Sequence, residues 1–513
     1  MKFLMAALAV FTGLAADAAS LREIVRAGRK WQLTPGCRVD GNLLTVEIPR
    51  ERWGNTEWAR TEIDLSPYEK RGFEACIRVR AEDTAKPTEP WLGFKFMLRW
   101  CDRFTGAMHY PGAGAPLGSF PWRMVSFRQD GAFRGADGSG VLHLGLQGSS
   151  GKLVFDLDSL EFGALRPIWP VTNQSLRCAY TCDVASRPAA RGVMSPSGRD
   201  MTEADFRTLA DWGVKLLRFQ MVRDWHGVGT NQDLAEFDRW LDGRLDHFKN
   251  TVLPLARKYG VFAVLDMHVT PGGRNASHET NMFHDRRFAS HFVNAWRRIA
   301  ERFAGENGIW AYDLVNEPHQ QTISPPGIDG WNLQREAAEA IRAVDAATPI
   351  LVEANSHASP DAFRNLSPLA LTNVAYEVHV YIPDDFTHQG IAGFASGPNR
   401  WPDKSRGWDR EYLRSVLAPV REFQLKHGAR IYVGEFSAVA WAEGAENYLA
   451  DCIALFEEYG WDWTYHAFRE WRGWSVEHEG FDIDHMSESV ANPRKNVLLK
   501  GFKASEAGFQ QVK

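Results

Sequence analysis

Short runs of alternating apolar and polar residues fill the chain from about residue 20 to residue 166. Alternation with a period of two is typical of strands that bury one face, and repeats with helical spacing are scarce in this part. Gly, Pro and Asp separate the runs, as they do at turns. The pattern predicts an all-β sandwich or jelly roll, with strands over 43–48, 75–79, 94–100, 141–146 and 153–162.

From about Cys178 onward, apolar strands alternate with amphipathic helices. Thr202 and Gly213, for example, fit the start and the end of one helix. Regular alternation of this kind requires parallel strands joined by right-handed helical crossovers. The fold class expected is therefore α/β, with a (β/α)8 or TIM barrel behind the N-terminal all-β domain. Its eight strands are predicted over 192–194, 214–219, 261–267, 310–315, 350–353, 375–381, 430–434 and 463–468.

The first residues have the features of a secretory signal peptide. Lys2 provides a positive charge, residues 3–16 form an apolar run, and Ala16-Asp17-Ala18 fits a small-x-small cleavage site. The run is short for a membrane span, with a retained N-terminal anchor as the alternative, and no later segment is long and apolar enough to cross a bilayer. We therefore expect a secreted, periplasmic or cell-surface protein without a membrane span after cleavage.

The length of 513 residues exceeds one ordinary domain. Together with the change of pattern, it predicts a signal peptide over 1–19, a β-sandwich over 20–170 and a barrel over 171–513. A net charge of -5 without a basic run disfavours a nucleic-acid partner. A monomer is expected.

Six cysteines are compatible with an exported protein and do not require a disulfide scaffold. Cys178 and Cys182 are close enough in the sequence to pair, with free thiols as the alternative. No second Cys pair or His pair follows at the spacing of a zinc site. Asp266-x-His268 is compatible with a metal-dependent barrel hydrolase, but the chain has no His-x-His motif, so neither a metal nor another cofactor is expected.

Polar residues follow the predicted barrel strands at their C-terminal ends, where TIM barrels carry their active sites. Each strand is otherwise apolar, so a polar group at its end is costly unless it is used or satisfied. Three carboxyls near strand ends, those of Asp266, Glu353 and Glu377, are interpreted as ion-pair groups. The candidate site residues are Arg218, His268, Asn316, Glu317, His379, Tyr381, Glu435 and Trp471.

Glu317 and Glu435 follow the predicted fourth and seventh strands, so a barrel can aim both carboxyls into one mouth. Cleavage of a glycosidic bond needs such a pair, with one carboxyl protonated and the other ionised. Arg218 and Tyr381 can keep Glu435 ionised, and Asn316 can bond the sugar 2-hydroxyl. The remaining expected roles are hydroxyl or carboxylate positioning by His268 and His379, and stacking under the reacting sugar by Trp471.

Six motifs stand in order within residues 178–500: Leu217-Arg-Phe219, Asp266-Met-His268, Asn316-Glu-Pro318, Val378-His-Val-Tyr381, Gly434-Glu-Phe436 and Trp471. This ordered set resembles glycoside hydrolase family 5, the cellulase family. The resemblance implies a retaining double displacement on a β-linked oligo- or polysaccharide, with Glu317 as acid/base and Glu435 as nucleophile. It leaves open which glycan is cleaved, and whether the cut is internal or at a chain end.

Three other functions are alternatives. A glycan-binding protein with an inactive barrel would lack one of the catalytic carboxyls, and neither is missing. A scaffold that acts through its β-domain would have no carboxyl pair in a cleft. A transglycosylase has the same residues as a hydrolase, and differs in that an acceptor sugar replaces water.

Aromatic residues are abundant, with 20 Trp and 30 Phe. Sugar rings stack their C–H faces on indoles, so Trp near a cleft is a candidate glycan platform, with core packing as the alternative. Residues 152–162 loosely resemble the closing strands of carbohydrate-binding jelly rolls, so the β-domain either binds sugar or is structural. The long loop over 383–408 is expected to wall the substrate cleft. Its aromatic residues are Phe386, His388, Phe394, Trp401 and Trp408, and Trp225 and Trp474 are expected around the same mouth, with local loop packing as the alternative for each ring.

Overall fold

The computed structural model describes residues 31–68, 72–89, 91–101, 108–129, 139–164, 169, 175–225, 229–275, 278–321, 328–391, 394 and 397–509. The expected signal peptide over 1–19 lies outside these residues. The chain divides into two compact units, Met1–Arg166 and Pro167–Lys513. Within the described part of the chain, no helix combines the length and the apolar character needed to cross a membrane.

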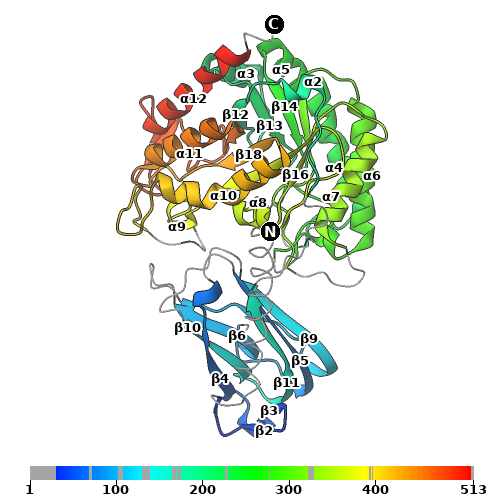
Figure 1. Cartoon of the computed structure of the whole chain (residues 1–513), viewed down its shortest axis with the longest axis vertical. Helices are drawn as coiled ribbons and strands as arrows, with labels where there is room; N and C mark the ends of the chain where they lie inside the picture. Colours follow the sequence, from blue (N-terminus) through cyan, green and yellow to red (C-terminus); the bar gives the residue numbers. More distant parts are fainter. Residues whose placement is uncertain are drawn as a thin grey trace, which may run out of the picture. The chain divides into compact units, whose positions relative to one another are not determined.

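The described strands of the first unit are β1 (Gln32–Leu33), β2 (Cys37–Asp40), β3 (Leu43–Ile48), β4 (Thr56–Asp64), β5 (Phe73–Thr84), β6 (Gly93–Cys101), β7 (Met108–His109), β8 (Gly112–Ala113), β9 (Gly118–Gln129), β10 (Ser139–Gln147) and β11 (Gly151–Ala164), with short helical turns η1 (Arg50–Arg52) and η2 (Ser66–Tyr68). They pair antiparallel in two sheets, β1-β4-β10-β6-β7 with β8 beside β6, and β2-β3-β11-β5-β9 (Figure 1). Side chains such as Val46, Ile63, Val79 and Leu144 from both sheets share one apolar core. The predicted all-β sandwich is thus confirmed.

The second unit is a closed barrel of parallel strands. Each strand pairs with the next, and the first pairs with the last through Gly192 and Thr464. The predicted eight-stranded barrel is confirmed, and Cys178 and Cys182 near its start are not joined by a disulfide. The strands are β12 (Arg191–Met194), β13 (Leu216–Gln220), β14 (Phe262–Asp266), β15 (Ile309–Asp313), β16 (Ile350–Glu353), β17 (Val374–Val380), β18 (Ile431–Phe436) and β19 (Asp462–Tyr465).

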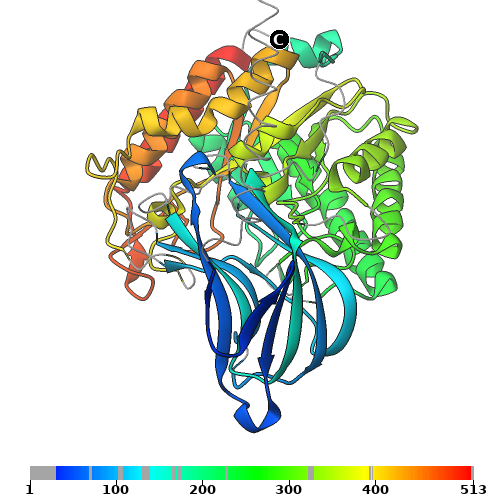
Figure 2. The same ribbon diagram turned by 60° about the horizontal axis from the view of Figure 1, so that its bottom comes forward.

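Helices surround the barrel on its outside (Figures 1 and 2). The first long one begins and ends as predicted, because Asp205 accepts a hydrogen bond from the Thr202 backbone N–H and Gly213 takes a left-handed φ of 84°. The long helices are α3 (Glu203–Trp212), α4 (Leu234–His247), α5 (Leu253–Tyr259), α6 (Arg286–Phe303), α7 (Gly330–Arg342), α10 (Arg410–His427), α11 (Ala445–Tyr459) and α12 (Pro493–Phe509). The shorter segments are α2 (Cys182–Ala185), α8 (Asn355–Ala358), α9 (Asp384–Thr387), η3 (Phe248–Val252), η4 (Asn281–Phe283), η5 (Pro360–Asn365), and the hairpin of β20 (His478–Gly480) and β21 (Met486–Glu488).

The inside of the barrel has an apolar floor with a polar layer above it. Leu216, Val264 and Leu351 belong to one small buried cluster contributed by different strands. Residues two positions apart in a strand face the same side. The polar layer therefore stands two positions further along each strand, at Arg218, Asp266, Asp313, Glu353 and Glu377.

In the loop over 383–408, three aromatic residues pack locally, the alternative that the sequence left open, while His388 packs against Tyr381 and Trp474. Phe386, Trp401 and Trp408 are 0%, 2% and 3% exposed. Phe386 packs against Trp401 and Tyr448, so these rings fill the space between the loop and α11. The loop is long enough to bury these rings in a small core of its own. The amino-acid composition of the segment does not show whether its aromatic rings are buried in this way or face a cleft.

Candidate active site

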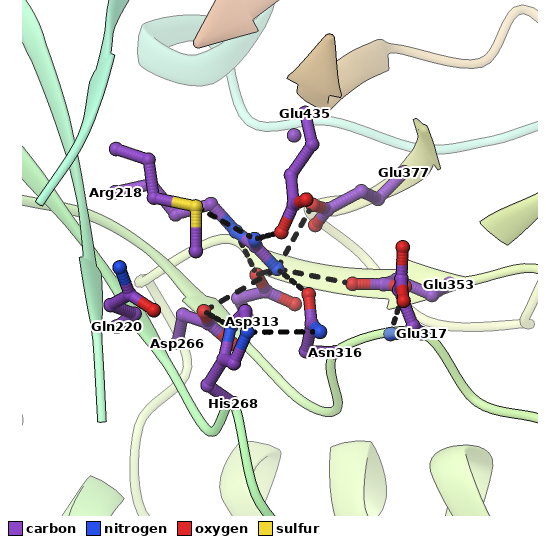
Figure 3. Close-up of polar contacts among 12 residues, drawn as sticks. Arg218, Gln220, Asp266, His268, Asp313, Asn316, Glu317, Glu353, Glu377 and Glu435 are labelled. Carbon is purple, nitrogen blue, oxygen red and sulfur yellow. Dashed lines mark hydrogen bonds and ion pairs between the residues drawn. The ribbon is translucent and has the colours of Figure 1, made fainter. Parts of the chain in front are cut away.

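Arg218 on β13 is the centre of the polar layer (Figure 3). Its side chain is fully buried, and its guanidinium meets carboxylates from five other strands. Nη1 lies 2.7 Å from Glu435 Oε1, and Nη2 lies 2.8 Å from Asp313 Oδ2. A guanidinium can serve many acceptors because it carries five N–H donors in one plane. The other contacts run from Nη2 to Asp266 Oδ2 at 3.5 Å, Glu353 Oε1 at 3.2 Å and Glu377 Oε1 at 3.3 Å.

One guanidinium cannot balance five buried negative charges, so some of these carboxyls hold a proton. Burial and the charge of Asp266 raise the pKa of Asp313 to about 6, against the attraction of Arg218. Burial and the charge of Asp313 raise the pKa of Glu353 and of Glu377 well above the usual carboxyl range. Glu353 and Glu377 are therefore carboxyls of the layer in which burial and neighbouring charge favour the protonated form.

Glycine at position 434 makes room for this layer. A Cβ atom at Gly434 would overlap the Oε1 atom of Glu377. Because residue 434 has no side chain, the Glu377 carboxyl can lie against β18 immediately before Glu435.

Glu435 is held by donors on both of its carboxylate oxygens. Arg218 donates to Oε1 at 2.7 Å, and the Tyr381 hydroxyl donates to Oε2 at 2.8 Å. Burial raises the pKa of Glu435, but the positive charges of His379, His466 and Arg218 outweigh this effect and hold the pKa well below the usual carboxyl range. Glu435 is therefore an ionised carboxylate with only 4% of its surface exposed.

Glu317 is held through its backbone, just past the end of β15. Its N–H donates to Glu353 Oε2 at 2.7 Å, and its carbonyl oxygen accepts from Arg274 Nη2 at 2.7 Å. The residue has a φ of +49°, a left-handed conformation that costs a residue with a side chain about 1 kcal/mol or more. Two buried polar side chains thus stabilise a backbone conformation that points Glu317 toward Glu435.

His379 lies between the two glutamates. Its Nδ1 atom is 3.0 Å from Glu317 Oε1 and 3.8 Å from Glu435 Oε2. One oxygen of each glutamate and one nitrogen of His379 all lie within 4.8 Å of one another. Burial raises the pKa of Glu317, but the hydrogen bond and positive charge of His379 outweigh it and bring the pKa to about 2. His379 thus favours the ionised form of Glu317.

Asn316 and His268 form a second hydrogen-bonded chain beside Arg218 (Figure 3). Arg218 donates from Nη2 to Asn316 Oδ1 at 2.9 Å, and Asn316 Nδ2 lies 3.2 Å from His268 Nε2. His268 Nδ1 lies 2.8 Å from Asp266 Oδ2, so in neutral form this nitrogen donates and Nε2 accepts. One N–H of Asn316 remains for a substrate hydroxyl.

Aromatic rings surround these groups. Trp225 packs on His268 at 4.8 Å and carries the Arg274 guanidinium over its ring at 4.3 Å. Trp471 is partly buried and packs edge-on against Trp474, at 5.3 Å between ring centres. A small hollow next to His268 is lined by Trp225, Asp224, Asn231, Thr270 and Arg274.

Two groups of described residues have the donor atoms of a metal site: Glu317, His379 and Glu435, and Glu353, Glu377 and His379. In each group Arg218 already bonds a carboxylate oxygen, of Glu435 and of Glu353. A divalent cation there would lie beside a buried positive charge, which opposes its binding.

All eight residues predicted from strand ends lie at the C-terminal end of the barrel, and seven of them form one connected polar network, with Trp471 beside it. The carboxyls of Asp266, Glu353 and Glu377 lie within 3.2–3.5 Å of Arg218 Nη2, the contacts expected from the sequence. The sequence analysis did not identify Asp313, Arg274 or His466. Asp313 ends an apolar strand and had the same signal as the others, whereas Arg274 lies in a loop and its contact with Glu317 leaves no pattern in the sequence.

A protein-family model described as cellulase, glycosyl hydrolase family 5, matches residues 182–470. Endoglucanase C of Acetivibrio thermocellus is 30% identical over 298 residues, which cover 52% of this chain and 84% of that protein. Cellodextrinase A of Ruminococcus flavefaciens is 25% identical over 268 residues, which cover 50% of this chain and 75% of that protein. Among solved structures, Cel5A of Thermotoga maritima in complex with cellobiose is 21% identical with a TM-score of 0.47, covering 61% of this chain and 97% of that one.

Proposed function

Because the chain belongs to glycosyl hydrolase family 5, it is a retaining hydrolase of β-linked glycans, and we propose that Glu317 and Glu435 are its catalytic pair. The observation that carries this assignment is the separation of the two side chains, whose nearest oxygens lie within 4.8 Å of each other. Retaining glycosidases place their carboxyl groups about 5–5.5 Å apart, and inverting ones about 6.5–9.5 Å apart. The short separation leaves no room for a water molecule behind the sugar and supports direct attack by one carboxylate.

In the first step, the Glu435 carboxylate attacks the anomeric carbon while Glu317 gives a proton to the departing glycosidic oxygen. A covalent glycosyl ester of Glu435 results. In the second step, Glu317 takes a proton from water, the water oxygen attacks the anomeric carbon, and Glu435 leaves as a carboxylate. Each displacement inverts the anomeric carbon, so two in succession retain its configuration.

The environment of Glu435 suits a nucleophile. Arg218 and Tyr381 donate to its oxygens and keep it ionised until it attacks. When the ester forms, Glu435 loses its charge, and Arg218 keeps an ionic partner in Asp313 at 2.8 Å. The buried guanidinium therefore stays paired through both steps, which avoids the large cost of an uncompensated buried charge.

The charge of Glu435 also supports the change of role of Glu317. Burial and the negative charge of Glu435 raise the pKa of Glu317, while His379 lowers it. The first step requires a protonated Glu317, which burial and the charge of Glu435 favour and the hydrogen bond and charge of His379 oppose. After the ester forms, that negative charge is gone, so the pKa of Glu317 falls and the carboxylate is ready to act as base.

The substrate class proposed is a β-linked glucan, cut internally. Endoglucanase C and Cellodextrinase A, to which the chain is similar, have names that support this choice. The purified protein should be incubated with β-glucans, β-mannans, xylans and aryl β-glycosides, with products read by chromatography and their anomeric configuration by NMR. Early products of mixed length from a glucan support internal cleavage. A β-anomer that appears first is expected, and an initial α-anomer contradicts the role of Glu435.

The same incubation separates hydrolysis from its alternatives. Longer products formed when an acceptor sugar is added would identify transglycosylation. A protein that binds a glycan and cleaves none would be the inactive-barrel alternative. We further propose an exported monomer, which is checked by N-terminal sequencing of the secreted protein and by light scattering after gel filtration.

A further inference from the structure

The β-sandwich exposes two tryptophans at one end. Trp53 is 51% exposed and Trp91 is 71% exposed, although burying a Trp side chain is strongly favourable. Single exposed apolar residues are ordinary on protein surfaces, but gathered ones mark binding sites. The strand register determines whether these two are gathered.

The register places both residues at the same end of one sheet. Gln147 on β10 pairs with Thr56 on β4 and with Gly93 on β6, so the starts of β4 and β6 lie in one row. Trp53 precedes β4 by three residues, and Trp91 precedes β6 by two. Neighbouring strands are about 4.8 Å apart, so the two strand starts are about 10 Å apart.

Hydrogen bonds hold the loops that carry these rings. The indole N–H of Trp53 donates to the carbonyl oxygen of Lys86 at 3.1 Å, and Lys95 Nζ donates to the carbonyl oxygen of Trp91 at 2.6 Å. The backbone N–H groups of Gly148 and Thr88 donate to the carbonyls of Asn55 and Gly148 at 2.8 Å and 2.7 Å. These hydrogen bonds join the loops to one another and restrict the movement of the segments that carry Trp53 and Trp91.

A hollow lies directly beside Trp53 and is lined with polar groups. Arg50, Asp83, Thr84 and Ser150 contribute to it. Asp83 has a left-handed φ of +51°, and its Oδ1 accepts a hydrogen bond from Ser119 at 3.0 Å. A positive and a negative side chain together offer donors and acceptors without a net charge, which suits a neutral ligand with many hydroxyls and disfavours a polyanion.

We propose that this end of the sandwich, defined by Trp53, Trp91, Arg50 and Asp83, is a binding site for a neutral β-linked glycan chain. The indoles supply flat apolar faces for sugar C–H groups, and Arg50 and Asp83 bond ring hydroxyls. The proposal rests on the assignment of the barrel to β-glycan hydrolysis, since a polymer held by the sandwich stays near the enzyme that cuts it. β11 begins at this end with Gly151 and finishes with Ala164 at the other, so the polypeptide leaves the sandwich away from the site.

Trp122 offers a matched control on the same domain. It is 37% exposed, and the Arg78 and Arg80 guanidinium groups lie over its ring at 5.0 Å and 5.5 Å. Its ring face is therefore covered by protein, and it should not stack on sugar. The Trp122→Ala variant therefore measures the effect of removing a partly exposed Trp outside the proposed site.

The experiment measures retention of the full chain on amorphous β-1,4-glucan, mixed-linkage β-glucan, β-mannan and xylan. All variants carry Glu435→Gln, so no polymer is consumed. Trp53→Ala and Trp91→Ala are each expected to weaken binding to at least one polymer about tenfold or more, as for truncation of an anchoring aromatic residue, while Trp122→Ala binds as the parent. Equal binding by parent and both site variants, equal loss in Trp122→Ala, or no binding by the parent to any polymer overturns the proposal.

With Glu435 intact, Trp53→Ala and Trp91→Ala are expected to hydrolyse a short soluble oligosaccharide with unchanged kcat/KM, and to lose activity only on the retained polymer. If the wild-type protein does not hydrolyse the soluble substrate, the result counts against β-glycan hydrolysis by the barrel, and not against the glycan site on the sandwich. Gel filtration of the same variants tests whether the two rings join copies of the chain; an assembly that dissociates in Trp53→Ala, with glycan retention unchanged, would replace the glycan by a second copy.

Discussion

Arg274 donates a hydrogen bond to the carbonyl oxygen of Glu317 at 2.7 Å, so a loop arginine positions the proposed acid/base through its backbone. On the other side of the same residue, Glu353 accepts the N–H of Glu317 at 2.7 Å. The left-handed φ of Glu317 is unfavourable for any residue with a side chain, and these two contacts oppose its relaxation. The direction of the Glu317 carboxyl therefore depends on two hydrogen bonds to its own backbone.

Replacing Arg274 by Gln removes the donor to the Glu317 carbonyl. We expect kcat/KM on an oligosaccharide to fall about tenfold to a hundredfold, the effect of losing one hydrogen bond from a charged group. Dinitrophenyl β-glycosides, whose leaving group needs no proton, should be affected only a few-fold, because the acid alone is misplaced. Arg287→Gln, an exposed arginine paired with Asp285, is the control. Equal losses on both substrates would show a general disturbance of the site.

Glu353→Gln tests the partner on the N–H side. The raised pKa of Glu353 favours its protonated form, and Gln is close to that form in charge and volume. Its two oxygens accept from Glu317 N and from Arg218 Nη2, and an amide has only one acceptor oxygen. We expect a loss of about 1–3 kcal/mol in the free energy of unfolding and reduced acid catalysis. Chemical denaturation of this variant and of exposed Glu336→Gln measures the difference; equal stabilities would count against a buried acceptor role.

Removing the imidazole in His379→Gln should raise the pKa of Glu317 from about 2 toward the ordinary carboxyl range. His379 is the main group that lowers this pKa, and burial and the charge of Glu435, which both raise it, remain. A ¹³C NMR titration of the labelled glutamate carboxyls, assigned with Glu317→Gln, reports the shift. An unchanged midpoint for Glu317 would mean that the imidazole is not its partner.

Arg218→Lys should raise the pKa of Glu435, because a single ammonium group replaces several donors at the ion pair. The nucleophile must be ionised, so activity is lost as the pH falls through its pKa, and a raised pKa moves the acidic limb of kcat/KM to higher pH. Tyr381→Phe removes one donor from Glu435 Oε2 and should shift the limb the same way, by less. A shift toward lower pH in either variant contradicts the assignment.

Glu435→Gln and Glu317→Ala should differ in the substrates that they still cleave. The first removes the nucleophile and should abolish cleavage of every substrate. The second should reduce oligosaccharide cleavage about 10²–10⁴-fold and spare the first step on dinitrophenyl glycosides. Added azide should then restore turnover of Glu317→Ala as a β-glycosyl azide, since azide needs no base. Rescue of Glu435→Ala by azide with an α-product distinguishes the two positions by product NMR.

Much of the site could be predicted because it follows from strand periodicity. Leu216 to Arg218, Val264 to Asp266 and Leu351 to Glu353 are the same step from an apolar floor to a polar layer. Since parallel strands end at one face of a barrel, each such step marks a group at the mouth. Asp313 follows the same rule from Ala311 and was missed only because no motif drew attention to it.

The sequence by itself determined the two folds, the strands and the groups at their ends, because hydrophobic periodicity and helix ends are local properties. The convergence of five carboxyls on Arg218 was decided by the tertiary structure, since Arg218 and Glu435 are 217 positions apart and meet only when the barrel closes. The order of the pKa values followed from the same closure, as burial and neighbouring charges exist only in the folded chain. For the same reason Phe386, Trp401 and Trp408 were buried and Trp53 and Trp91 exposed: the side of a loop on which an aromatic ring finds partners is a property of packing, which residue type alone does not specify.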